Sequence, residues 1–487
     1  MRLGVGLLFL AAGFLEITSA QQLKLPPPSK AIPSTTVKPD LEHLTLEAVL
    51  AAVEKHYPPL RAALLDQPIA DAEYLAAQGR FDLAIRSIVD TNNLGFYESR
   101  RWDVSVEQPL QTWGASVFSG YQVSSGRFPS YDGKFQTDGL GEYRAGLRVP
   151  LLRDREIDGR RTDLRKADVG RRIADLGIRQ QRIVILQLAT NRYWNWVAAG
   201  RRFEVANAIL NIAVDRETIL EKAVELGQLP AFEVQDNKRI IEQRRAQQVM
   251  ARRALEAASF DLSLFYRDGQ GQPVIPQNSQ LPPAFPEPAA IDDRQLEADI
   301  EMALRRRPEI ARLENQQEQV RLDRRLAQNR RLPNIDFLLT FDRELGQRQV
   351  LRGPSELRAG LIFDLPLQRR TATGQAIAAQ QRINQIDQRL TFLRDQITVE
   401  VRDAVSAVRA AYESAMATRS EVTFTRNVED LERQRYDLGE SNLFFLNTRE
   451  IQTADAAVRE VGALADYYRA LALYELAIAK ALGNVRP

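Results

Sequence analysis

The chain has 487 residues, of which 44% are hydrophobic and 27% charged, so it is long and apolar enough to bury a large core. Lysine and arginine (66) nearly balance aspartate and glutamate (64), which gives no reason to expect a nucleic-acid partner. Without cysteine, and with only His43 and His56 as histidines, the chain offers no thiol chemistry, no disulfide, no site for cysteine-linked lipid and no ordinary zinc site. We therefore expect no metal and no cofactor.

The N-terminus is typical of an exported protein. An arginine, an apolar run over residues 3–15 and the small residues Thr18-Ser19-Ala20 predict a signal peptide over residues 1–20, the alternative being a buried N-terminal helix. Residues 21–43 are rich in proline, which predicts an extended arm. No later stretch approaches the ~20 apolar residues of a transmembrane helix, so a membrane crossing would have to use strands.

After a helical pattern over residues 44–79, residues 81–150 alternate with a period of two, as strands with two different faces do. The alternation is found in Phe81–Arg86, Trp102–Glu107, Ala115–Val123 and Tyr143–Val149. Aromatic residues are frequent here, among them Trp102, Trp113, Tyr121 and Tyr143. Strands with an apolar face, a charged face and flanking rings indicate a membrane β-barrel; the alternative is an ordinary antiparallel sheet with one wet face.

A long helical hairpin is expected next. Helical periodicity continues over residues 158–227, with Ile183, Leu186, Ala189, Tyr193 and Trp196 on one stripe. Glycine and proline in the turn 226–230 end this helix and start a returning one over residues 231–266.

The same plan then occurs again. A linker rich in glycine and proline (268–293) separates repeat 1 (44–267) from repeat 2 (294–483), which is followed by a short tail (484–487). Repeat 2 has a helix, strands over residues 335–366 and a second helical hairpin with its tip at 438–442. Repeat 1 has about 36 additional residues in its strands, for which we identify the hairpin 101–123; its position in the fold stays open.

No catalytic constellation is found. Carboxylate groups are numerous but lie beside arginines on amphipathic helices, which is typical of solvated faces, and phosphate-binding, nucleophile-elbow and zinc-protease motifs are absent. We therefore do not expect an enzyme.

The order of these elements resembles that of the TolC family of outer-membrane efflux proteins. The likeness rests on Leu-Gly at both helical turns, on Pro150-Leu151 and Pro366-Leu367 at both strand-to-helix junctions, and on the terminal Ala481-Leu482-Gly483. The resemblance implies a mostly helical homotrimer with a membrane β part. Each subunit would give four strands to a shared twelve-stranded barrel, and the hairpins would form a long periplasmic α-barrel. A periplasmic adaptor and an inner-membrane pump would dock at the helical end.

The resemblance also implies roles for residues at the two tips. Leu226, Gly227, Leu438 and Gly439 become candidates for adaptor contact, and they are also expected to be plain helix caps.

The resemblance further implies a gate in which the Tyr436 hydroxyl donates to the Glu233 carboxylate; the alternative for Glu233 is a solvated surface position. Family acids and an arginine are replaced here by Ser441, Phe445 and Thr448. Phe444 and Phe445 would then either close the tip as an apolar plug or pack between helices.

The sequence therefore predicts a passive exit duct of the outer membrane, serving a tripartite efflux or type I secretion system and opened at its helical tip. The alternative is a coiled-coil scaffold of the cell envelope without a conduit. The alternating strands in both repeats favour the duct, because a scaffold does not need them. A porin would be mostly strand, unlike this chain.

Overall fold

The computed structural model describes residues 43–346 and 355–480, which belong to one compact unit. The expected signal peptide, nearly all of the proline-rich arm and the expected tail lie outside the described residues. So does the Ala-Leu-Gly motif at 481–483.

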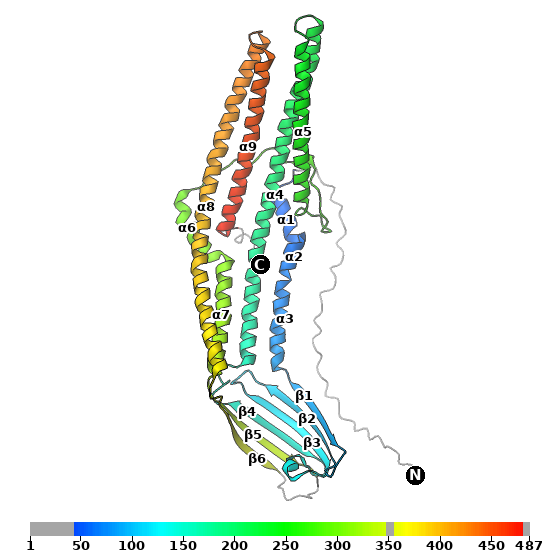
Figure 1. Ribbon diagram of the computed structural model, residues 1–487, viewed down its shortest axis with the longest axis vertical. Helices are drawn as coiled ribbons and strands as arrows, with labels where there is room; N and C mark the ends of the chain where they lie inside the picture. Colours follow the sequence, from blue (N-terminus) through cyan, green and yellow to red (C-terminus); the bar gives the residue numbers. More distant parts are fainter. Residues whose placement is uncertain (1–42, 347–354, 481–487) are drawn as a thin grey trace, which may run out of the picture. The chain divides into compact units, whose positions relative to one another are not determined.

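The structure contains two successions of short helices, strands, a long helix and a returning helix (Figure 1). The first comprises α1 (Leu46–His56), α2 (Pro58–Leu64), α3 (Asp66–Gln78), β1 (Ala84–Asn92), β2 (Ser99–Pro109), β3 (Ser116–Gly126), β4 (Glu142–Pro150), α4 (Gly159–Glu225) and α5 (Phe232–Ser263). The second comprises α6 (Leu296–Arg306), α7 (Pro308–Asn329), β5 (Asn334–Glu344), β6 (Glu356–Asp364), α8 (Arg370–Asp437) and α9 (Leu443–Ala477). The expectation of a mostly helical chain with an antiparallel sheet is confirmed.

All six strands form one antiparallel sheet in the order β1-β2-β3-β4-β5-β6. The additional hairpin is β2 and β3, and it lies inside the sheet between β1 and β4. The four strands per chain implied by the family resemblance are therefore wrong for this protein. The reason is that β2 and β3 alternate in phase with their neighbours, so the sheet can accept both while Arg100 is the only charged residue that they add to its apolar face.

The first strand also begins later than expected. Phe81 lies in the 3₁₀ turn Gly79–Phe81 with its ring buried, and the strand begins at Ala84. The expected strand start at Phe81 is therefore wrong, because the buried Phe81 belongs to the turn that follows α3.

Helices α4 and α9 begin at side-chain caps, and the long helices α4 and α8 bury apolar stripes. The Asp158 carboxylate accepts a hydrogen bond from the Arg161 amide (3.0 Å), which satisfies one of the free amides at the start of α4. Along α4 the predicted stripe is buried, with Tyr193 3% and Trp196 0% exposed, and Val401 on α8 is fully buried. The expected apolar stripe on α4 is confirmed. No helix of the described ranges is apolar enough over a sufficient length to cross a bilayer.

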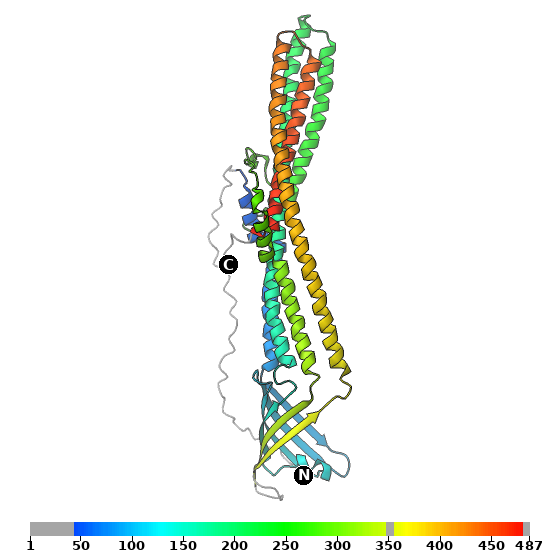
Figure 2. The same cartoon turned by 90° about the vertical axis from the view of Figure 1, so that its left-hand side faces the viewer.

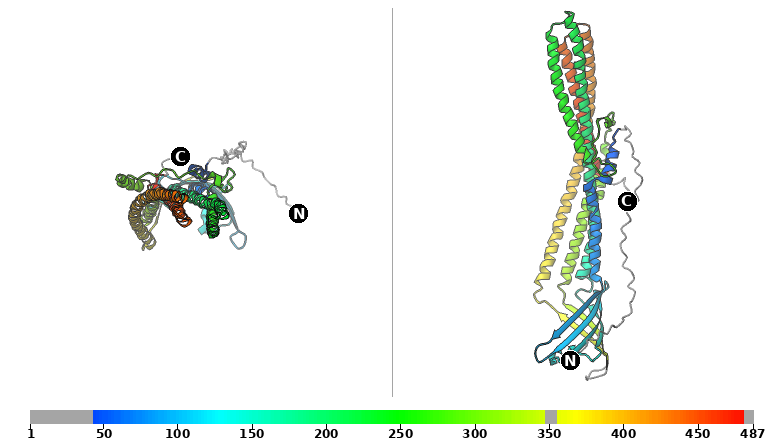
Figure 3. Two further views of the ribbon diagram at one scale, coloured as in Figure 1. Left: turned by 90° about the horizontal axis from the view of Figure 1, so that it is seen from above. Right: turned by 90° about the vertical axis from the view of Figure 1, so that its right-hand side faces the viewer.

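The helices next to the sheet follow the same lateral order as the strands to which they are connected. Near the sheet, α3, α4, α7 and α8 lie side by side in that order and connect directly to β1, β4, β5 and β6. Beyond the middle, the order of neighbouring helices is α5, α4, α9, α8. Both hairpin tips lie at the end opposite the sheet (Figure 2), and the long helices form a curved layer when viewed along their length (Figure 3).

The connection at residues 268–293 packs across the middle of the helices. The Phe285 ring stacks on Trp194 (5.7 Å between centroids), and Trp194 stacks on Tyr468 (4.3 Å). The Tyr468 hydroxyl donates to the Pro286 carbonyl at 2.6 Å. These contacts join the connection to both hairpins, so it is an integral part of the core and more than a spacer.

Candidate functional site

Both hairpin tips are built by the same local motif. After α4, the Gly227 amide donates to the Val224 carbonyl and the Gln228 amide to the Ala223 carbonyl, both at 2.9 Å. After α8, the amides of Gly439 and Glu440 make the equivalent bonds. These are Schellman caps, which need a left-handed residue, and the two glycines have φ of +69° and +77°. Each glycine is therefore required as a helix cap, whatever else it does.

The tips also present apolar surface. Leu226 is 73% exposed and Leu438 74% exposed, and both directly precede the cap glycines. An added Cβ at Gly227 or Gly439 would meet nothing within 4 Å, so the surroundings of both turns are open. The four candidate docking residues thus lie on exposed turns at the same end of the molecule.

The candidate gate pair is placed close together without being joined. The Tyr436 ring packs against the buried side chains of Leu220, Val234 and Leu443. Burial raises the pKa of the Tyr436 hydroxyl, and the charge of the neighbouring Glu233 adds to the rise. Within the ranges that the structure covers, no hydrogen bond links the two residues. The tyrosine–glutamate bond stays a prediction for the assembled channel.

Phe444 and Phe445 occupy the first turn of α9. The Asn442 side chain caps this turn by accepting from the Phe445 amide at 3.2 Å. The two rings contact edge to face at 5.7 Å between centroids, and they are 71% and 50% exposed. Within the single chain both rings are therefore exposed, and closure of the tip by an apolar plug and packing between helices both stay predictions.

The positions that depart from the family pattern have local partners. The Ser441 hydroxyl donates to the Glu432 carboxylate on α8, which closes the tip turn on itself. The Thr448 hydroxyl donates to the Phe444 carbonyl in its own helix at 2.8 Å. Among the described residues, the hydrogen bonds of both side chains stay within the α8–α9 hairpin.

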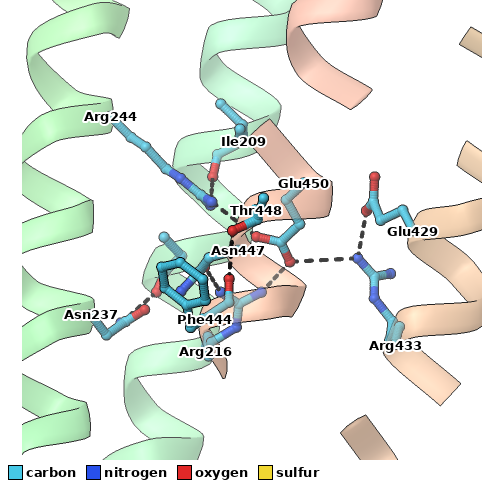
Figure 4. Close-up of polar contacts among 11 residues, drawn as sticks. Ile209, Arg216, Asn237, Arg244, Glu429, Arg433, Phe444, Asn447, Thr448 and Glu450 are labelled. Atoms are coloured by element: carbon cyan, nitrogen blue, oxygen red, sulfur yellow. Dashed lines mark hydrogen bonds and ion pairs between the residues drawn. The ribbon is translucent and has the colours of Figure 1, made fainter. Parts of the chain in front are cut away.

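A buried ionic cluster below the tip joins the two hairpins (Figure 4). Its centre is Glu450 on α9, whose side chain is 1% exposed. One carboxylate oxygen accepts from Arg216 on α4, and the other accepts from Arg244 on α5 at 2.9 Å. Arg216 also donates to the Asn447 side chain at 2.6 Å. We call Arg216, Arg244, Asn447 and Glu450 the Glu450 cluster.

The Glu450 cluster carries more positive than negative charge. Burial lowers the pKa of the Arg244 guanidinium, while its bond to Glu450 acts in the opposite direction. Arg433 of α8 approaches the same carboxylate at 3.8 Å but bonds mainly to Glu429 at 3.0 Å. A buried carboxylate with two arginines is costly to break, since removal of one partner leaves an unpaired charge away from water.

Our sequence reasoning did not identify this cluster. Its signal is a stripe on α9 in which Leu443 and Leu446 are followed at spacings of four and three by Glu450 and Thr453. All four are buried. Charged or polar residues at apolar stripe positions indicate a specific partner, but the sequence does not name it.

The sheet has two chemically distinct faces, because residues paired across strands share a face. The apolar face carries Ile85, Val89, Trp102, Val104, Val106, Val117, Tyr121, Val123, Tyr143, Leu147, Val149, Ile335, Phe337, Leu339, Phe341, Leu357, Leu361 and Phe363. The same face also carries the polar residues Ser87, Thr91, Arg100, Gln108, Ser119, Ser125 and Arg343. The other face carries ion pairs between strands, including Arg144 with Asp103 and Arg358 with Asp342 (2.6 Å).

Three of the four expected barrel aromatics lie on the apolar face: Trp102 and Tyr143 near the ends of β2 and β4 away from the helices, and Tyr121 at the middle of β3. Trp113 lies in the turn between β2 and β3 at the helical end. The eleven residues of β2 extend ~36 Å, or ~26 Å of height at a tilt near 45°. This matches the ~25 Å apolar band of membrane barrels.

No group of three or more acidic or histidine side chains suitable for a metal ion occurs in the part of the chain that the structure describes.

Solved structures with the same fold exist at low sequence identity. The Campylobacter jejuni CmeC outer membrane channel is 14% identical, with a TM-score of 0.61 over 89% of this chain and 85% of that one. The Neisseria gonorrhoeae MtrE outer membrane channel, solved in its open state, is 16% identical, with a TM-score of 0.62 over 89% and 88%. The outer membrane protein VceC of Vibrio cholerae is 14% identical, with a TM-score of 0.61 over 89% and 95%.

No protein-family model and no curated protein matches the sequence. The structural likeness establishes the fold of the single chain, in agreement with the resemblance to the TolC family, except that the sheet has six strands instead of four. The homotrimer and the shared barrel stay predictions. The similar structures are outer-membrane channels and not enzymes, in agreement with the lack of a catalytic motif.

Proposed function

We propose that this chain is one subunit of a homotrimeric outer-membrane channel that acts as the passive exit duct of a tripartite efflux or type I secretion system. The observation that carries the proposal is the two-faced sheet at one end of helical hairpins whose tips both lie at the other end. An apolar face suits lipid and a charged face suits a water-filled lumen. The helices then extend into the periplasm.

A coiled-coil scaffold is the competing function. It accounts for the hairpins but gives no reason for a sheet whose apolar face is continuous over six strands. A single chain leaves both sheet edges unpaired, and backbone groups cannot stay unpaired in lipid. Assembly of several copies removes that cost, and it also favours the channel over a monomeric scaffold.

Cell fractionation and reconstitution test the proposal directly. We expect the exported protein to remain with outer membranes after urea washing, to need detergent for extraction, and to conduct ions in planar bilayers. A soluble monomer after export, or a detergent-extracted trimer that never conducts, would contradict the channel.

We place the adaptor contact of this channel at Leu226, Gly227, Leu438 and Gly439. The support is their exposure on capped, open turns at the tip end. Apolar groups on rigid turns can insert between helices of a partner with little ordering cost. The adaptor would be periplasmic and would link the channel to an inner-membrane pump.

We place the gate at the same end, with Tyr436, Glu233 and the exposed Phe444 and Phe445. Rings gathered around a narrow helical opening can exclude water, and a tyrosine–carboxylate bond of about 1.5–3 kcal/mol is weak enough for a docked partner to displace. We expect Tyr436→Phe combined with Glu233→Gln to raise single-channel conductance. Tyr436→Phe alone keeps the ring but already removes the donor of this bond, so it should raise the conductance as well. Unchanged conductance in the double variant would exclude this bond as part of the gate.

A further inference from the structure

Hairpin β2–β3 is a full part of the sheet. β2 pairs with β1 from Ala84 opposite Glu107 to Asn92 opposite Ser99, and β3 pairs with β4 over seven residue pairs. The side chains of the hairpin follow the faces of its neighbours, with Trp102 on the apolar face. A hairpin folded into a lumen or against the helices would not need an apolar face in phase with the rest of the sheet.

Strands β1 and β6 form the two open edges of this sheet. Each has nine residues, and every one of them is exposed, whereas β2 and β3 contain buried positions. With six strands in antiparallel succession, β1 and β6 run in opposite directions. The β6 edge of one copy can therefore pair antiparallel with the β1 edge of the next, with the apolar faces kept together.

We propose that a second copy of this chain covers each edge, and that three such copies close a barrel of eighteen strands. The number of copies rests on the function proposed above, and the six strands per chain come from the sheet. The eighteen strands replace the twelve implied by the family resemblance.

The width of the helical layer agrees better with six strands per chain than with four. Four helices per chain, α3, α4, α7 and α8, connect directly to strands, and neighbouring helices lie ~8–10 Å apart, which gives an arc of ~32–40 Å. Six strands spaced by ~4.8 Å and tilted by ~40° occupy ~38 Å of arc, and four strands ~25 Å. Six strands therefore continue the wall of the helical layer at nearly equal width, whereas four would narrow it abruptly.

Charge fixes a register for the contact between copies. Asp90 of β1 and Arg358 of β6 both point to the polar face, and their side chains are 67% and 68% exposed. Asp90 pairs within the chain with Arg101 at 3.8 Å, and Arg358 pairs with Asp342 at 2.6 Å and with Glu356 at 4.0 Å. When Asp90 lies opposite Arg358 in an antiparallel pair, the residue two positions before Asp90 lies opposite the residue two positions after Arg358. This register therefore places Ile88 opposite Gly360.

Electron cryo-microscopy of the full-length channel in lipid nanodiscs tests the strand count. Eighteen strands give a backbone diameter of about 36 Å and twelve give about 24 Å. We expect a three-fold ring of the wider diameter, and we expect a variant that lacks residues 99–126 to form the narrower one. A wild-type three-fold ring of about 24 Å would overturn the inference and leave the channel standing. Failure of the wild type to form any ring in lipid would overturn both.

Disulfide cross-linking tests the edge contact, and the absence of native cysteine makes it simple to read. An added Cβ at Gly360 meets nothing within 4 Å, so a cysteine fits there. We expect Ile88→Cys with Gly360→Cys to give covalent trimers on oxidation. The matched control, Val89→Cys with Gly360→Cys, places the thiols on opposite faces and should stay monomeric in denaturing gels. Monomers from both pairs would overturn the proposed pairing.

Discussion

The Glu450→Gln substitution should loosen the tip half of the molecule and leave the half next to the sheet unchanged. Glutamine keeps the size of the side chain but leaves Arg216 and Arg244 without a counter-charge, and Arg244 is 3% exposed. Removal of one partner of a buried ion pair costs about 3–5 kcal/mol. At the lower value, local opening of α9 around Glu450 becomes about a hundred times more frequent, since each 1.4 kcal/mol is tenfold.

Hydrogen exchange with mass spectrometry measures this effect by region. Peptides from residues 443–457 should exchange about a hundred times faster in Glu450→Gln, and peptides from the core around Trp196 should not change. The control is Glu221→Gln on α4, which removes a solvent-exposed carboxylate that pairs with Lys238 on α5. It should have little effect on hydrogen exchange because water screens this ion pair.

A second variant separates charge from packing. Replacing the ionic groups together, as Arg216→Met, Arg244→Met and Glu450→Leu, removes the unpaired charges, and such exchanges are often neutral or stabilising. We expect exchange near the wild-type rate. Equal exchange in wild type and Glu450→Gln, or equally fast exchange in the single and triple variants, would refute the role assigned to buried charge.

Three further predictions concern the tip, the middle and the docking surface. Gly439→Ala places an alanine in the left-handed conformation and should destabilise the tip by about 1 kcal/mol, measured as faster proteolysis after α8. The control, Gly177→Ala within α4, should stabilise its helix by a similar amount. Equal effects of the same sign would contradict the role of Gly439 as a helix cap. Burial raises the pKa of Tyr193, whose hydroxyl donates to the Leu44 carbonyl, to about 12. The hydroxyl loses its proton near pH 10 in the unfolded chain and only near pH 12 in the folded chain. The free energy of unfolding is therefore unaffected below pH 10 and falls by about 2–3 kcal/mol between pH 10 and pH 12. Denaturation at pH 9 and 11.5 measures this loss, which Tyr193→Phe should reduce. Leu438→Glu should abolish retention of the periplasmic adaptor on the immobilised channel without changing its oligomeric state; retained adaptor would place the docking surface elsewhere.

Local patterns in the sequence were sufficient for the elements and their faces. Period-two alternation identified five of the six strands to within about three residues but only the first part of β1, and the stripe through Tyr193 and Trp196 identified the buried side of α4. Leu-Gly at both turns predicted the helix caps, because the left-handed conformation after a helix is a local requirement. The start of β1 was misplaced, since the sequence does not reveal that the Phe81 ring is buried in a turn.

Only the tertiary structure decided which elements meet. The hairpin 101–123 has the same alternation whether it extends the sheet or folds away, and its place between β1 and β4 follows from pairing with strands on both sides. Glu450 is one acid among 64 in the sequence, and its partners lie more than 200 positions away on other helices. The sequence by itself determined the period and chemistry of each segment, because these depend on neighbours in the chain. The pairing of distant segments depends on contacts in space. These contacts joined six strands in one sheet and connected the two helical hairpins through the buried Glu450.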